Sequence, residues 1–115
     1  MQPMPVTRCI IAVLRDRWRD NESTTFAGIA EHYYGTRDTG GISHLLDRTS
    51  RPKDIDRLVS AVATAAGVSA GAIWRDAVDL AEAQDVEEVL HADDKAWAKQ
   101  MQERQAQGGR RRANG

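Results

Sequence analysis

The sequence predicts an all-α fold, with a five-helix domain followed by a C-terminal helical extension. Apolar residues recur at spacings of three and four along most of the 115-residue chain, which is typical of the buried face of an amphipathic helix. Glycine, proline and N-cap residues divide these stretches into segments of helical length. No segment has a convincing strand pattern of alternating apolar and polar residues, so we expect helices alone.

The first predicted helix covers Val6–Arg19, after residues 1–5, which we expect to be disordered. Ile11, Leu14 and Trp18 fall at positions i, i+3 and i+7 and therefore share one face of this helix. We place its charged residues on the solvent side, and these are Arg15, Asp16, Arg17 and Arg19.

Residues 25–46 predict two short helices joined by a glycine-containing turn. The hydroxyl group of Thr25 can cap the first helix, and Gly35 can end it in the left-handed conformation. Asp38 can then cap the second helix. Helices joined so tightly cross steeply, which leaves one side of the second helix free to enter a DNA groove. The segment is therefore predicted to be a helix-turn-helix, and the apolar face of its second helix is formed by Ile42, Leu45 and Leu46.

Two longer helices are predicted next. Pro52 fits the first turn of one helix, Gly67 ends it, and Ser69 caps the other. The apolar face of the earlier helix consists of Ile55, Leu58, Val59, Val62 and Ala63. That of the later helix consists of Ile73, Trp74, Ala77, Leu80 and Ala81.

The apolar pattern changes phase near Gln84, and the remaining residues fit three arrangements. A sixth helix can begin at Asp85, with Glu88 completing an acidic variant of a capping box. Alternatively, one helix can run over residues 72–107, or a separate last helix can begin at residues 93–94. We divide the chain into a domain at 6–83, a helical extension at 84–107 and a flexible basic tail at 108–115.

The net charge of −1 conceals an uneven distribution. Residues 8–75 include ten Lys/Arg and eight Asp/Glu, whereas residues 76–107 include three and nine. The tail then adds Arg110, Arg111 and Arg112. Because DNA affinity depends on the charge of the facing surface, this balance permits DNA binding and argues against a strong nonspecific DNA coat.

Cys9 is the only cysteine, so the chain cannot form an internal disulfide. Its apolar neighbours favour a buried, inert thiol, and this cysteine usage fits a reducing cytoplasm. The longest apolar run, at residues 9–14, is too short to cross a bilayer, and the N-terminus lacks a signal-peptide pattern. We therefore expect a soluble cytoplasmic protein that is associated with the nucleoid when it binds DNA.

Residues 8–75 resemble the phage-repressor-like helix-turn-helix family, the XRE type that includes the repressor and Cro proteins of lambda-like phages. The family's usual pattern has a threonine cap, a leucine-alanine pair, a glycine turn, an isoleucine-serine pair, a basic loop with proline, and a fourth helix ending in G-V-S. In this chain the corresponding residues are Thr25, Ile29-Ala30, Gly35, Ile42-Ser43, Arg48 to Pro52 and Gly67-Val68-Ser69. The resemblance implies a five-helix, lambda-repressor-like domain that reads DNA through its second central helix.

The sequence departs from the family pattern at the front of that helix. The turn is slightly longer than usual, and Phe26 replaces a common polar residue. Gly40 and Gly41 stand where side chains normally read bases, and each glycine costs roughly 1 kcal/mol of helix stability relative to alanine. Either the helix begins later than the pattern suggests, or its backbone approaches DNA closely.

The predicted DNA-binding residues lie around the second central helix and in the loop after it. Arginine can bind guanine through two hydrogen bonds, and threonine and serine can contact a thymine methyl group or a phosphate. Basic loop residues are suited to phosphates. The candidates are Arg37, Thr39, Gly40, Gly41, Ser43, His44, Arg48, Arg51 and Lys53. The alternative is an ordinary solvated surface, with the loop charges neutralised by Asp47, Asp54 and Asp56.

The aromatic residues divide into core and surface candidates. Trp18, Trp74 and Tyr33 are expected to pack in the core, and Tyr34 to be exposed beside the turn. Trp97 lies on an otherwise polar helix, which favours an exposed partner surface and self-association. The predicted partner or dimer interface consists of Leu90, Trp97 and Met101.

These observations favour a sequence-specific DNA-binding transcriptional regulator of prokaryotic or phage type. A homodimer is expected because one short helix reads few base pairs, whereas two copies can bind half-sites about one DNA turn apart. The alternatives use the same fold as a protein-interaction adaptor or antirepressor, or as an antitoxin-like protein whose acidic C-terminal helix binds a partner. No nucleotide-binding loop, zinc-protease motif or cysteine pair occurs, so we expect no enzyme activity, no cofactor and no metal, and we interpret His91 beside Asp93 and Asp94 as solvated.

Overall fold

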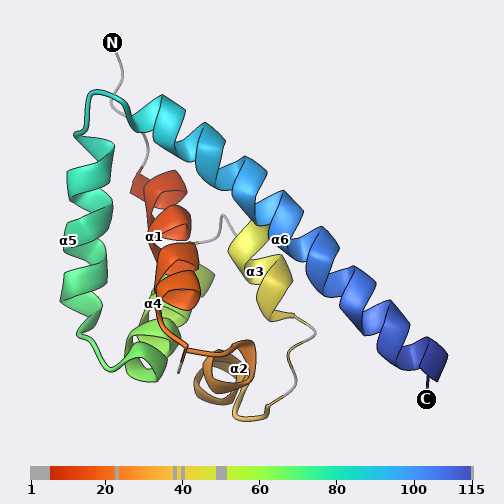
Figure 1. The fold of residues 1–115 in the computed structure, drawn as a ribbon. Helices are drawn as coiled ribbons and strands as arrows, with labels where there is room; N and C mark the ends of the chain where they lie inside the picture. Colours follow the sequence, from red (N-terminus) through yellow and green to blue (C-terminus); the bar gives the residue numbers. More distant parts are fainter. Residues whose placement is uncertain (1–5, 23, 38, 40, 49–51, 115) are drawn as a thin grey trace.

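The computed structural model describes residues 6–22, 24–37, 39, 41–48 and 52–114, and these ranges contain helices and no strand (Figure 1). At 48, 52–53 and 105–114 it describes the backbone alone. The prediction of an all-α fold is confirmed. The helices are α1 (Val6–Asp20), α2 (Phe26–Tyr34), α3 (Ile42–Arg48), α4 (Pro52–Ala66), α5 (Ala70–Ala81) and α6 (Val86–Asn114).

Local signals in the sequence determine where several helices begin and end. The hydroxyl oxygen of Thr25 accepts a hydrogen bond from the Gly28 N–H at 3.0 Å, which caps α2. Ser69 caps α5 in the same way. Gly35 and Gly67 have φ angles of 81° and 73°, the left-handed conformation in which glycine ends a helix without strain. The predicted ends of α2, α4 and α5 are therefore confirmed.

The core forms where α1 packs against α4 and α5, and where α2 packs against α4. Each of these four helices contributes fully buried apolar side chains, including Leu14, Ile29, Leu58 and Ile73. Cys9 is also fully buried, and burial raises the pKa of its thiol. The thiol therefore stays neutral near pH 7, in agreement with the predicted inert cysteine.

The chain turns after α5, and α6 then runs without a break to Asn114. The arrangement with a sixth helix beginning beside Asp85 is confirmed. One continuous helix from Ala72 and a separate helix from Asp93 are both wrong. The backbone of residues 108–114 continues α6, so the helix passes through the boundary that we placed after Gln107.

Helix α6 runs beside α1 in the same direction. Near the start of both helices, Oε2 of Glu87 lies 3.9 Å from Nη1 of Arg8. Near the end of α1, Arg19 donates a hydrogen bond to Gln100 at 2.9 Å. The C-terminal turns of α6 project past the other helices (Figure 1). The molecule therefore measures 53 × 28 × 24 Å.

The predicted partner surface on α6 is a contact within the chain. Trp97 is 2% exposed, and its ring meets Trp18 edge-on, with 5.5 Å between the ring centroids. Trp18 in turn stacks on Phe26 at 4.6 Å. Leu90 is buried as well, and Met101 packs half-buried against the core. The prediction that Trp97 presents an exposed ring to another molecule is wrong, because α6 folds back along α1.

The predicted solvent side of α1 also needs correction. Arg15 is only 4% exposed, and the side chain of Arg19 is 16% exposed. Asp16 is exposed and Arg17 is half-buried. Arg15 and Arg19 both bind residues of α6, so this helix covers a side of α1 that the sequence suggested was open.

The described residues include no single helix with the length and apolar character of a membrane span. The pair Asp54–Ala66 and Ala70–Ala81, bent by 114°, meets that test only when its two helices are taken together.

Replacing Trp97 by alanine should lower the free energy of unfolding by about 3–5 kcal/mol, the usual cost of removing a buried tryptophan side chain. Urea unfolding measures this change. Val89→Ala is the control, because Val89 lies on the same helix and is 37% exposed, so its effect should stay within about 0.5 kcal/mol. Unchanged stability of the Trp97 variant, together with a loss of self-association in sedimentation, would restore the partner-surface interpretation.

Candidate nucleic-acid interface

The connection between α2 and α3 places the start of α3 later than the sequence suggested. The N–H of Ile42 donates to the carbonyl oxygen of Thr39 at 3.1 Å, and the N–H of Leu45 donates to that of Gly41 at 3.1 Å. Gly41 therefore precedes α3, which is the first of the two outcomes expected for the glycines. Asp38, the predicted cap, lies outside the described residues, as does Gly40.

Helix α3 is buried on one side and accessible on the other. Ile42 and Leu46 are fully buried, and they pack α3 against the hydrophobic core. His44 is exposed, while Ser43 and Thr39 are half-buried. The predicted base-reading side chains thus stand around the first turn of α3, where another molecule can reach them.

Arg37 lies in the turn before α3 and is paired within the chain. Its side chain is 65% exposed and donates a hydrogen bond to Glu31 of α2 at 2.8 Å. Such exposed pairs contribute only about 0–1 kcal/mol, so a phosphate or a base edge can replace the carboxylate at little cost.

Gly41 allows an aromatic residue to lie over the start of α3. A Cβ atom at position 41 would overlap the hydroxyl oxygen of Tyr34 and would lie 3.2 Å from its ring carbon Cζ. Tyr34 also meets Tyr33 edge-on at 4.7 Å. Tyr33 is buried and Tyr34 is 44% exposed, as predicted. Glycine at position 41 therefore has a packing role, and Tyr34 adds a hydroxyl group to the same surface.

The loop after α3 is only partly described. Arg48 is the last residue of α3 and Lys53 is the second residue of α4, but their side chains lie outside the description, and so does all of Arg51. The contact of these three residues with phosphates stays a prediction.

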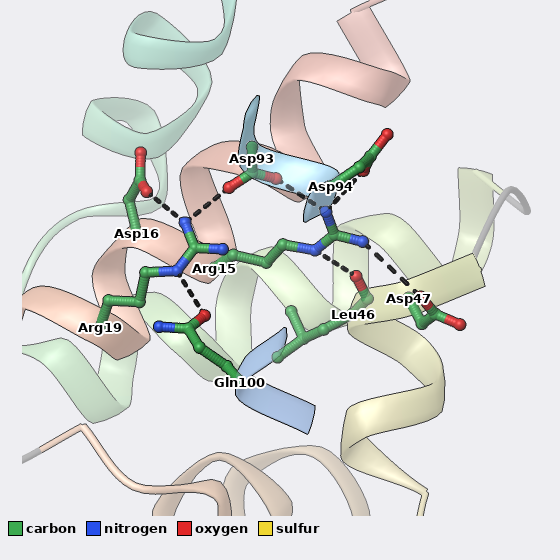
Figure 2. A network of polar contacts seen from close by, with 8 residues as sticks. All are labelled: Arg15, Asp16, Arg19, Leu46, Asp47, Asp93, Asp94 and Gln100. Carbon is green, nitrogen blue, oxygen red and sulfur yellow. Dashed lines mark hydrogen bonds and ion pairs between the residues drawn. The ribbon is translucent and has the colours of Figure 1, made fainter. Parts of the chain in front are cut away.

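A buried arginine anchors the other end of α3. Arg15 of α1 donates from Nε to the carbonyl oxygen of Leu46 at 2.9 Å. Its Nη1 donates to Asp93 at 2.7 Å and to Asp94 at 2.9 Å, both in α6. Figure 2 shows this guanidinium between the last turn of α3 and the first half of α6. One side chain of α1 therefore ties α3 to α6.

Arg19 extends this network by one turn of α1. It donates from Nη1 to both Asp16 and Asp93, and from Nε to Gln100. The side chain of Asp93 is 8% exposed, and a carboxylate buried to this extent needs charged partners to offset its lost hydration. Two arginines supply them. The guanidinium of Arg15 also lies 4.9 Å from the centroid of the Trp97 ring, a cation–π contact.

The sequence contains a signal for this network in the apolar stripes of α1 and α6. Arg15 stands four residues after Ile11 and three before Trp18, inside the apolar stripe of α1. Asp93 likewise stands three residues after Leu90 and four before Trp97. Opposite charges within the apolar stripes of two helices indicate a buried ion pair between them.

Comparisons with protein-family models, with curated protein sequences and with solved structures found no match. Among the described side chains, no group of His, Cys, Asp and Glu residues is arranged to hold a metal ion.

Replacing Arg15 by methionine should lower the free energy of unfolding by about 3–5 kcal/mol, because it leaves carboxylates and a carbonyl group without their buried donor. The matched control is Arg17→Met, which breaks the exposed pair of Arg17 and Asp76 and should cost no more than about 1 kcal/mol. Urea unfolding of both variants measures the difference. Equal losses would mean that the Arg15 network adds nothing beyond a surface ion pair.

Proposed function

We propose that this protein is a sequence-specific DNA-binding transcriptional regulator of prokaryotic or phage type, with α2 and α3 as a helix-turn-helix in a lambda-repressor-like domain. The observation that carries the proposal is the environment of α3. Its inner side is buried through Ile42 and Leu46, its last turn is anchored by Arg15, and His44 is exposed. A recognition helix needs this combination of a fixed inner side and a free outer side.

The side chains around the first turn of α3 have the chemistry for reading base edges. Hydroxyl groups of Thr39 and Ser43 can donate to or accept from bases, and the Thr39 methyl group can contact that of thymine. The imidazole ring of His44 offers a further donor or acceptor. In the geometry of this motif, the N-terminal residues of the second helix face the bases, which is where these residues stand.

Contacts with the DNA backbone would fix the register of α3. Arg48, Arg51 and Lys53 come after the recognition segment in the sequence, and we assign them to phosphates. Arg37 can join them by exchanging Glu31 for a phosphate oxygen. Such contacts orient the protein on the duplex and carry no sequence information themselves.

We further propose that the protein acts as a homodimer. One α3 helix reads only a few base pairs, and two copies related by a two-fold axis would bind half-sites about one helical turn of DNA apart. The buried Leu90 and Trp97 are not part of the proposed dimer interface.

Selection from fragmented genomic DNA of the host tests the proposal. The purified protein is mixed with sheared fragments at near-physiological salt, and the bound fragments are sequenced. Enrichment of a few fragments that share a two-fold symmetric motif is the expected result. Uniform recovery of fragments that disappears with modest salt would mean that the protein binds DNA only by nonspecific electrostatic attraction. If no fragment is recovered, the protein-interaction alternative is favoured.

On a recovered fragment, replacing His44 by alanine should weaken binding by about 1–3 kcal/mol for a lost base contact. Binding to a random duplex should change little, because phosphate contacts provide that affinity. Competition measured by fluorescence anisotropy separates the two quantities. His91→Ala is the matched control, since His91 is an exposed histidine on α6. Equal weakening on both duplexes would assign His44 to the DNA backbone, and no weakening would remove it from the interface.

A further inference from the structure

Helix α6 changes the sign of its charge along its length. Residues 86–94 contain four acidic residues and no lysine or arginine. Residues 95–115 contain six lysines or arginines and one acidic residue, Glu103. The acidic part includes Asp93 and Asp94, which bind Arg15. The basic part begins where α6 passes the end of α1.

One basic residue of this part of α6, Arg104, contacts the start of α2. Arg104 extends over Phe26, with its guanidinium carbon 4.4 Å from the centroid of the ring. Phe26 is the first residue of α2, directly after its cap Thr25. From Arg104 onward α6 continues past the domain (Figure 1). Ten further residues of helix, 105–114, extend this part by about 15 Å at 1.5 Å per residue.

The first two basic residues of this part of α6 are not neutralised by ion pairs with the described side chains. Lys95 and Lys99 are both exposed on α6, and neither forms an ion pair with any side chain that the structure describes. The helix dipole favours cations only within the last turn of a helix, whereas Lys95 and Lys99 lie near the middle of α6. A run of basic residues after an acidic segment is thus suited to an external polyanion.

We propose that the distal part of α6, residues 95–114, is a second DNA-binding element that contacts the phosphates passing the N-terminus of α2. This inference rests on the proposed function. When the second helix of a helix-turn-helix enters the major groove, its first helix crosses the sugar–phosphate backbone. A strand that passes the start of α2 would come close to Arg104, which lies over Phe26. The helix beyond Arg104 is long enough to span about four base-pair steps of 3.4 Å.

If the distal part of α6 contacts phosphates, DNA binding should release additional counterions. Each neutralised phosphate contributes about 0.9 to the slope of log K against log salt. The contact is independent of sequence, so it should act equally on a target fragment and on a random duplex. The α6 contact adds affinity for any duplex, whereas α3 distinguishes the target fragment from other sequences.

The test compares two double variants of the full chain that lower the charge equally. Lys99→Gln with Arg104→Gln alters the distal part of α6. Arg8→Gln with Arg75→Gln is the control. Arg8 is an exposed residue near the start of α1, and Arg75 is an exposed residue of α5. Binding of each protein to a short fluorescein-labelled random duplex is measured by anisotropy across a NaCl series. The distal variant should reduce the salt slope by about 2, and the control variant should leave it unchanged.

A third variant separates charge from packing, because Arg104 also stacks on Phe26. Arg104→Lys keeps the positive charge and loses the planar guanidinium, so it should retain the wild-type salt slope. Thermal unfolding followed by circular dichroism shows whether each variant is folded at the temperature of the measurement. If Arg104→Lys lowered the slope as much as the double variant Lys99→Gln with Arg104→Gln, the phosphate contact would be overturned in favour of a packing role.

The remaining outcomes distinguish the two proposals. If the wild-type protein fails to bind any duplex at low salt, the proposed function is wrong, and this inference with it. If it binds and the distal and control variants have equal slopes, the inference about α6 is overturned while the role of α3 stands. A reduced slope together with an unaffected His44→Ala variant would support the α6 contact and count against base reading by His44.

Discussion

The buried guanidinium of Arg15 is the constraint that joins α3 and α6 to α1. A buried charge costs several kcal/mol unless it is fully paired, and Arg15 finds its partners in two other helices, the Leu46 carbonyl oxygen in α3 and Asp93 and Asp94 in α6. Apolar side chains can often replace a buried ion pair without loss of stability. The contribution of Arg15 is therefore chiefly geometric, since its directional donors require α1, α3 and α6 to be in place together.

This constraint matters most for α3, because so short a helix is not stable alone. Its position comes from Ile42 and Leu46 beneath it and from Arg15 at its end. The same network sets the register of α6 along α1. That register brings Trp97 against Trp18 and Arg104 over Phe26. The two elements that we assign to DNA, the front of α3 and the distal part of α6, thus share one scaffold.

The sequence predicted those features that local chemistry determines. Thr25 and Gly35 act within a few residues of themselves, so the ends of α2 could be located without knowledge of the fold. Trp97 could not be placed, because its burial depends on contact between helices about eighty residues apart in the chain. The start of α3 similarly depends on how Tyr34 packs over Gly41. Ser43 and His44 were placed on the second central helix from spacing alone, but no spacing indicates what they bind.

Amide chemical shifts during a titration with duplex DNA test the central claim most directly. With a ¹⁵N-labelled protein and a fragment recovered by selection, we expect the largest changes at residues 41–45, with further changes in the distal part of α6. Residues of α5, on the opposite side of the domain (Figure 1), should change little. Changes concentrated in α5, or none at saturating DNA, would contradict a DNA-reading role for α3.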